Sequence, residues 1–322
     1  MSELRPPPAP RRHLLSVGDL TTEDVVRILD TADSLAASLD REMKKLPTLR
    51  GRTVIHLFYE SSTRTLSSFE LAAKRLSADT MSLRSSGSSV DKGESLKDTA
   101  LTLAEYEPDV IVVRHPHIGA PQLIARTTRA HVVNAGDGKH QHPTQALLDL
   151  FTIREALGRL EGVSVAIVGD VLHSRVARSL VEALLLVGAD ALLVAPPTLL
   201  PRGIEELGCR VSHRIEDIAD ADVVYALRMQ SERMQAGAAF VPSLREYTAL
   251  YGITPERVRN GQLVMHPGPM NRGVEIDPRV ADSGASLVTT QVRSGLVVRM
   301  AILYDLLTSP TLQAAPLALE VA

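Results

Sequence analysis

The sequence predicts an α/β protein built from two doubly wound parallel-sheet domains with a cleft between them. Short β-branched and aliphatic runs alternate with segments whose apolar residues recur at helical spacing, which is typical of a parallel sheet covered on both faces. This rhythm occurs in two sets, the second beginning near residue 163. At 322 residues the chain is also too long to fold around one ordinary hydrophobic core.

The first set predicts a domain over residues 1–141. An opening helix is expected with Thr22 as its cap and with an apolar stripe along its buried face. The stripe comprises Val25, Val26, Leu29, Ala32, Leu35, Ala36 and Leu39. The strands expected next are Thr53–Phe58, Thr80–Leu83, Val110–Val113 and His131–Asn134. The helices expected between them are Arg64–Leu76, Glu94–Leu103 and Ala120–Thr128.

The second set predicts a domain over residues 142–290, joined to the first by a helix over Pro143–Leu157. Its expected strands are Val163–Val168, Ala191–Ala195, Val223–Leu227 and Leu263–His266. A helix capped by Thr254, with Pro255 in its first turn, should precede the last strand. Asp277-Pro278 is expected to form a turn. The final apolar helix begins near Gln291, and we expect residues 291–322 to pack back on the first domain.

Composition narrows the class of protein. Hydrophobic residues make up 44% and charged residues 23% of the chain, as in ordinary globular enzymes, and a formal net charge of −3 argues against a nucleic-acid partner. No apolar run reaches the roughly 18 residues that span a bilayer, so no membrane partner is expected. The N-terminus through Arg12 reads as a disordered tail without a signal peptide. A single cysteine, Cys209, excludes an intrachain disulfide and fits a cytoplasmic protein.

The most informative segment is Phe58–Thr65, where a strand is expected to turn into a helix. It places several hydroxyl groups and the Arg64 guanidinium at the positive end of the helix dipole. Backbone N–H groups are also free at such a point, which favours a phosphate-like dianion. A simple Ser/Thr-rich helix cap with a surface arginine is the alternative.

Polar residues follow several other predicted strands. Because ligands of open α/β sheets bind at the carboxyl ends of strands, we expect these residues to gather. They are Arg114, His142 with Gln145, Arg175, Arg228 with Gln230, and the run His266-Pro267-Gly268-Pro269. The groups up to and including Gln145, together with the Ser62–Thr65 segment, suit a small phosphorylated ligand with a carbonyl group. The arginines after Gln145 suit a dicarboxylate, since each guanidinium can bind a carboxylate in bidentate fashion.

The ordered set Ser62-Thr63-Arg64-Thr65, Arg114-His115-Pro116, His142-Pro143-Thr144-Gln145 and His266-Pro267-Gly268-Pro269 resembles the aspartate/ornithine carbamoyltransferase family over roughly residues 13–307. The resemblance implies transfer of the carbamoyl group of carbamoyl phosphate to the amino group of an amino acid. It implies no cofactor and no metal, because phosphate is already a good leaving group. It further implies a homotrimer, with regulatory chains or a dihydroorotase as further partners left open.

The resemblance also implies roles for individual residues. Catalytic roles fall on Arg64, Thr65, Arg114 and His142. Carbamoyl phosphate would be bound by these four with Ser62, Thr63, Gln145, Pro267, Gly268 and Pro269, and by Ser88 and Lys92 of a neighbouring subunit. L-Aspartate would be bound by Lys92, Arg175, Arg228 and Gln230.

Alternatives remain at this point. The family motif usually continues with an arginine where this chain has Leu66, so one cation is missing. Aspartate is favoured over ornithine because two arginines suit two carboxylates and the late loop carries no cysteine. A dinucleotide-dependent oxidoreductase lacks its full glycine motif, and a metal pair at His140 and His142 lacks further ligands. A catalytically silent metabolite-binding homologue is the remaining alternative.

Overall fold

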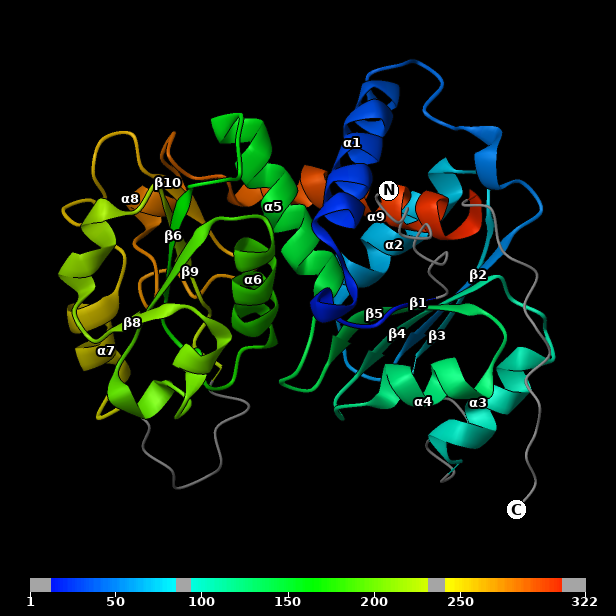
Figure 1. Ribbon diagram of the computed structural model, residues 1–322, viewed down its shortest axis with the longest axis horizontal. Coiled ribbons are helices and arrows are strands. Elements are labelled where there is room, and N and C mark those ends of the chain that lie inside the picture. The colour runs from blue at the N-terminus through cyan, green and yellow to red at the C-terminus, as the bar shows by residue number, and fades with distance from the viewer. Residues whose placement is uncertain (1–12, 85–93, 231–240, 309–322) are drawn as a thin grey trace, which may run out of the picture.

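The computed structural model describes residues 13–84, 94–230 and 241–308. Within these residues the chain forms two five-stranded parallel sheets that lie side by side, with helices α5 (Pro143–Leu157) and α9 (Val288–Thr308) between them (Figure 1). The predicted fold class is therefore confirmed.

The first sheet has the order β1-β5-β4-β2-β3, and every neighbouring pair is parallel. Its strands are β1 (His13–Leu14), β2 (Thr53–Phe58), β3 (Asp79–Arg84), β4 (Val110–His115) and β5 (His131–Asp137). Four of them were predicted to within three residues at either end. The two-residue strand β1 was not predicted, because it is too short to carry a periodic pattern.

Alternate residues of these strands enter two different cores. Ile55 and Leu57 face one side, where helices α3 (Leu96–Ala104) and α4 (Ala120–Thr127) cover the sheet. Val54 and Val112 face the opposite side, toward helices α1 (Thr22–Leu39) and α2 (Thr63–Arg75) and the α5–α9 pair (Figure 1). Burial on both faces explains why the strands are continuously apolar.

The second sheet has the order β10-β9-β6-β7-β8 and is also parallel. Its strands are β6 (Ser164–Val168), β7 (Asp190–Val194), β8 (Arg210–Ser212), β9 (Val223–Ala226) and β10 (Leu263–Met265). Its helices are α6 (Arg175–Leu186), α7 (Leu244–Tyr251) and α8 (Pro278–Ala281). Short 3-10 helices span Val17–Asp19, Pro47–Leu49, Pro197–Leu199, Ile204–Leu207 and Ile215–Asp220.

Four local predictions were wrong. The cap of α1 is Thr21, whose hydroxyl accepts the Asp24 N–H, while Thr22 is the first helical residue. Val26 is 45% exposed and lies outside the buried stripe. No helix follows Thr254, and α7 begins earlier, capped by Ser243. Asp277 and Pro278, expected to form a turn, begin the short helix α8.

The final helix α9 starts at Val288, three residues before the predicted point, and packs against α1, α2 and α5. One continuous apolar cluster runs from the first sheet through α5 and α9 to the second sheet. The predicted tail through Arg12 and the residues after Thr308 lie outside the described residues.

Candidate active site

The strand orders place both predicted groups of polar residues at topological switch points. In the first sheet the chain runs from β2 outward to β3 and then crosses back to β4 on the other side of β2. In the second sheet it runs from β6 outward through β7 and β8 and then crosses back to β9 on the other side of β6. The switch points therefore lie between β2 and β4 and between β6 and β9. Such a point opens a crevice at the carboxyl ends of the strands. The Glu60–Thr65 segment and Arg114 stand at the first crevice, and Arg175 and Arg228 stand at the second.

A single cavity of about 1090 Å³ joins the two crevices. All the described residues that were predicted from the sequence to form the site line this cavity. These residues are Ser62, Thr63, Arg64, Thr65, Arg114, His142, Gln145, Arg175, Arg228, Gln230, Pro267, Gly268 and Pro269. Ser88 and Lys92 lie within 85–93, outside the described residues. Leu66 is buried in the core and does not line the cavity.

The cavity is strongly cationic. Among the described residues that line it there are six arginines and a single carboxylate, Glu60; the arginines are Arg64, Arg114, Arg175, Arg228, Arg293 and Arg299. Glu60 Oε2 lies 3.2 Å from Arg114 Nε and 2.7 Å from Arg175 Nη2. Glu60 therefore bridges Arg114 of the first half and Arg175 of the second half. The remaining arginines leave the cavity with an excess of positive charge, which favours anionic ligands.

Two helices begin at the cavity without an acidic residue in their first turns. Helix α2 has Ser62 as its N-cap, and helix α5 has His142, and neither side chain caps its own helix. Thr63 and Thr65 in α2 and Gln145 in α5 line the cavity. The positive ends of both helix dipoles add to the arginine charge, as the predicted anion site requires.

Arg64 and Arg228 come from different sheets and approach each other. Partial burial lowers the pKa of Arg64, and the positive charge of Arg228 lowers it further. The Arg64 guanidinium also packs against Gly268, whose φ is +63°; a Cβ at this position would lie 2.6 Å from Arg64 Cζ. Only glycine fits this backbone and this contact, so the 266–269 loop and α2 meet across the cavity.

His142 is an uncharged donor or acceptor in this cationic setting. Burial lowers the pKa of His142 well below its ordinary value, and the charges of Arg114, Arg175 and Arg299 act in the same direction. The Thr144 hydroxyl lies 3.5 Å from Nδ1, and the His142 backbone N–H donates to Ser179 Oγ at 2.8 Å. A neutral ring that accepts at Nδ1 carries its proton on Nε2 and can donate there.

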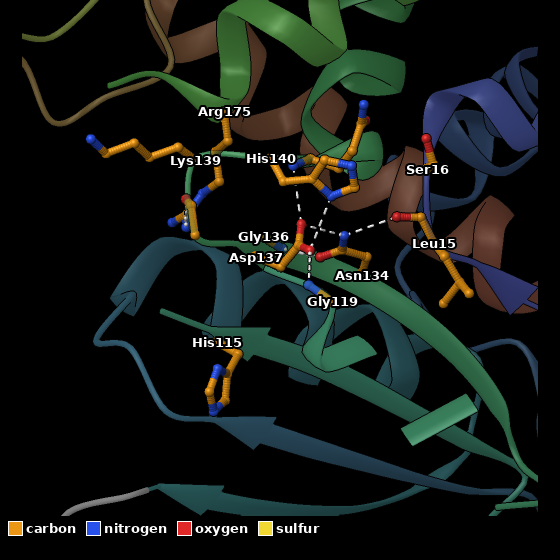
Figure 2. A network of polar contacts seen from close by, with 12 residues as sticks. Leu15, Ser16, His115, Gly119, Asn134, Gly136, Asp137, Lys139, His140 and Arg175 are labelled. Carbon is orange, nitrogen blue, oxygen red and sulfur yellow. Dashed lines mark hydrogen bonds and ion pairs between the residues drawn. The ribbon is translucent and has the colours of Figure 1, made fainter. Parts of the chain in front are cut away.

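Arg175 is held by the connection between β5 and α5. Its Nη1 donates to the Gly138 carbonyl at 2.9 Å, and a Cβ at Gly136 would lie 2.8 Å from its Nε. Buried Asp137 organises this connection (Figure 2). Its Oδ1 accepts from Asn134 Nδ2 and the Gln141 N–H, and its Oδ2 accepts from the Gly119 N–H and contacts His140 Nδ1, all within 3.1 Å. His140 is thereby engaged by a carboxylate.

The 266–269 loop and Gln230 are also fixed by buried carboxylates. His266 Nδ1 accepts the Gly268 N–H at 2.7 Å, so its Nε2–H donates to Glu275 Oε1 at 3.1 Å. The Gln230 N–H donates to Asp170 Oδ2 at 3.2 Å. These contacts orient the second sheet's side of the cavity before any ligand binds.

Glu60, Arg299 and Asp149 were not nominated from the sequence. Arg299 lines the cavity, donates to Ser68 Oγ at 2.7 Å and stacks over Phe69. Burial lowers the pKa of Arg299 to about 10, so the side chain stays charged at neutral pH. A charged residue inside an otherwise apolar helical run is the signal that could have found Arg299 and Asp149.

Within residues 13–84, 94–230 and 241–308, no group of three or more His, Cys, Asp or Glu side chains could hold a metal ion. In that same part of the chain, no helix has the length and apolar character needed to cross a bilayer.

Two family models together match most of the chain. The first, "Aspartate/ornithine carbamoyltransferase, carbamoyl-P binding domain", matches residues 12–155, and the second, "Aspartate/ornithine carbamoyltransferase, Asp/Orn binding domain", matches residues 161–306. A relative from Acidothermus cellulolyticus, named aspartate carbamoyltransferase catalytic subunit, is 58% identical over 92% of each chain. A relative of the same name from Corynebacterium glutamicum is 54% identical over 92% of this chain and 97% of its own.

Two solved structures of similar shape are named aspartate transcarbamoylase. The catalytic subunit of M. Jannaschii aspartate transcarbamoylase is 39% identical, with a TM-score of 0.81 over 92% of this chain and 98% of its own. Aspartate transcarbamoylase from Trypanosoma cruzi, in complex with N-(phosphonacetyl)-L-aspartic acid, is 32% identical. Its TM-score is 0.83 over 91% of this chain and 95% of the solved chain.

Proposed function

The chain belongs to the aspartate/ornithine carbamoyltransferase family, and from that premise we propose that it transfers the carbamoyl group of carbamoyl phosphate to the amino group of L-aspartate. The products are N-carbamoyl-L-aspartate and phosphate, and the reaction is an early step of pyrimidine synthesis. The observation that carries the proposal is the single cavity lined by Arg64 from one half and Arg228 from the other.

The phosphate of carbamoyl phosphate binds at the start of α2. The Ser62–Thr65 segment supplies hydroxyl groups, backbone N–H groups and the Arg64 guanidinium at the positive end of the helix. Arg114 adds a second cation beside this segment. The absence of an acidic residue from the first turn of α2 supports this placement.

The carbonyl oxygen of the carbamoyl group gains negative charge when the aspartate nitrogen attacks its carbon. Thr65, Arg114 and the neutral His142 are the donors proposed for this oxygen. One such donor typically contributes about 2.7–4 kcal/mol to the transition state. The phosphate then leaves with the electron pair of the broken C–O bond, and the amine proton passes to a base, for which the departing phosphate is a candidate.

The aspartate carboxylates bind Arg175 and Arg228, with Gln230 beside them. Arg175 is already held by Glu60 and Gly138, so its guanidinium is preorganised. The solved Trypanosoma cruzi relative that holds N-(phosphonacetyl)-L-aspartic acid supports this arrangement, because that ligand joins a phosphonate to a dicarboxylate. An ornithine substrate would bring an amine toward the cationic cavity and is disfavoured.

Arg64→Ala tests the proposal. Purified wild-type protein should form carbamoyl-aspartate in a colorimetric assay and should not carbamoylate ornithine. Arg64→Ala should lower kcat/KM by about a hundredfold to a thousandfold with little change in thermal stability, since it removes one charged donor that lines the cavity and lies outside the apolar core. Arg52→Ala removes an exposed arginine that pairs with Asp109, outside the residues that line the cavity, and should leave the activity unchanged.

Near-normal turnover of Arg64→Ala would contradict the phosphate role. Absence of carbamoyl-aspartate in the wild-type reaction would favour a silent metabolite-binding homologue.

We further propose a cytoplasmic homotrimer in which residues 1–141 with 291–322 bind carbamoyl phosphate and residues 142–290 bind aspartate. The family resemblance supports this assembly, with Ser88 and Lys92 of a neighbouring chain completing each cavity. Regulatory chains or a dihydroorotase are further candidate partners. Sedimentation of the purified protein at the mass of one chain would contradict the trimer, and its recovery outside the cytoplasmic fraction would contradict the location.

A further inference from the structure

A buried carboxylate, Asp149, lies one helical turn beyond Gln145 on α5. Its side chain has no exposed surface, and it does not line the cavity. Gln145 does line the cavity and is itself 92% buried, being 8% exposed. Asp149 can therefore affect a ligand only through the residues that it contacts.

Three donors converge on this carboxylate. Oδ1 accepts from Gln145 Nε2 at 3.1 Å and from Gln291 Nε2 at 2.7 Å. Oδ2 accepts from the Tyr225 hydroxyl at 2.8 Å. The donors come from three different elements, α5, α9 and β9.

These contacts decide which way the Gln145 amide points. An ionised carboxylate can only accept hydrogen bonds, so the NH₂ group of Gln145 must face Asp149. The carbonyl oxygen of Gln145 is then left to face the cavity as an acceptor. Gln291 is fixed by the same rule, because its carbonyl oxygen accepts the His266 N–H at 2.9 Å.

We propose that Asp149 is a positioning residue: it makes Gln145 present an acceptor to the cavity, and so selects a ligand that carries N–H donors at the transferred group. The inference rests on the proposed function and deepens it. The amide of carbamoyl phosphate offers such donors, whereas acetyl phosphate places a methyl group at the same position. Asp149 thus contributes to discrimination between two ligands of nearly equal size and equal charge.

Asp149 can select the carbamoyl ligand in this way only while its side chain is ionised, so the selection depends on pH. Burial raises the pKa of Asp149 to about 7, while its three hydrogen bonds and the charge of Arg299 act in the opposite direction. Burial also raises the pKa of Tyr225 well above its ordinary value, so Tyr225 stays protonated. At pH 8 Asp149 is mainly the carboxylate, and at pH 6 it is mainly the neutral acid, whose O–H must donate a hydrogen bond to one of its neighbours.

Asp149→Asn provides the first test. The Asn amide can donate to the Gln145 carbonyl, which lets Gln145 turn its NH₂ group toward the cavity. At pH 8, calorimetric titration should show the Kd of carbamoyl phosphate rising about tenfold, as expected for one hydrogen bond to a charged network, and the Kd of acetyl phosphate changing less than about twofold. A merely structural role would weaken both ligands in equal proportion.

Tyr225→Phe is the matched control, because it removes the donor to Oδ2 and leaves the contact between Oδ1 and Gln145. It should lower stability and leave the ratio of the two Kd values unchanged. Wild-type protein provides a second test that does not depend on a variant folding. Its preference for carbamoyl phosphate over acetyl phosphate should be smaller at pH 6 than at pH 8, since Asp149 gains a proton between them.

An unchanged ratio in Asp149→Asn, or a wild-type ratio that is equal at the two pH values, would overturn the role of Asp149. Failure of the proposed function would look different, because wild-type protein would then bind neither phosphate or would show no preference for the carbamoyl compound at pH 8.

Discussion

At the scale of single residues, the described lining of the cavity sets six arginines against one carboxylate, Glu60. Burial and the surrounding positive charge lower the pKa of His142, so its ring is neutral where a histidine in water would begin to take up a proton. A neutral ring adds no further positive charge that a bound anion would have to compensate. His142 therefore serves as a hydrogen-bond donor whose state does not change near neutral pH.

This state of His142 can be measured. Nuclear magnetic resonance of ring-labelled histidine should show His142 still neutral at pH values where the unfolded chain is already protonated, because burial and the neighbouring arginine charges lower its pKa. The unfolded chain in denaturant is the control and should titrate near pH 6.5. Since the unfolded chain binds this proton first, His142 also favours unfolding as the pH falls below about 6.5. A midpoint above pH 6.5 in the native protein would contradict the assignment.

Residues that lie together in the sequence were predictable, and residues that meet through the fold were not. The Ser62–Thr65 motif and the arginines after strands carry their signal locally, and the cavity includes all of them that are described. Asp149 and Gln291 are 142 positions apart in the sequence, so no local pattern in either segment predicts their contact. Glu60 lies two residues before the Ser62–Thr65 motif in the sequence, yet its pairing with Arg175 forms only when both sheets are in place.

At the scale of elements, the connection from β5 to α5 determines where Arg175 and His142 stand. Asp137 closes this connection with its side chain, and Figure 2 shows it at the centre of contacts from Gly119, Asn134 and His140. The carbonyl groups of Gly138 and Lys139 then hold Arg175 and Arg178. The five-residue connection 138–142 thus couples the first sheet to helix α6.

Asp137→Asn should therefore weaken both the fold and the site. One oxygen becomes an NH₂ group that faces existing donors, and we expect a loss of about 3 kcal/mol in the free energy of unfolding, measured by urea titration. The kcat/KM for aspartate should also fall, because Arg175 loses its support. Asp282→Asn, at an exposed pair with Arg272, is the control and should change stability by less than about 1 kcal/mol. Equal stability of the two variants would refute this role.

The predicted helix after Thr254 was wrong because tertiary contacts outweigh the local sequence pattern there. Thr254 and Pro255 form a standard helix-start signal, but Ile253 is held by its neighbours before that point. Its N–H donates to the Glu275 carbonyl at 3.0 Å, and its carbonyl accepts the Asp277 N–H at 2.9 Å. The backbone then turns instead of forming a helix. The longer buried strands were predicted well because continuous apolar runs record burial on both faces.

At the scale of the whole molecule, two parallel sheets place their switch points at one shared cavity. The alternation of strands and helices made this architecture predictable, whereas the approach of Arg64 to Arg228 and Gly268 follows only from the way α5 and α9 join the halves. The central claim is that two anions are bound by different halves and meet between them.

Calorimetric titration with N-(phosphonacetyl)-L-aspartate tests this claim most directly, since the compound joins a phosphonate to a dicarboxylate. We predict one molecule bound per chain, with a Kd at least about a hundredfold lower than that of either fragment alone. Arg64→Ala and Arg228→Ala should each raise that Kd by about tenfold or more. Binding no tighter than that of the phosphonate fragment, or a Kd that Arg228→Ala leaves unchanged, would contradict the account.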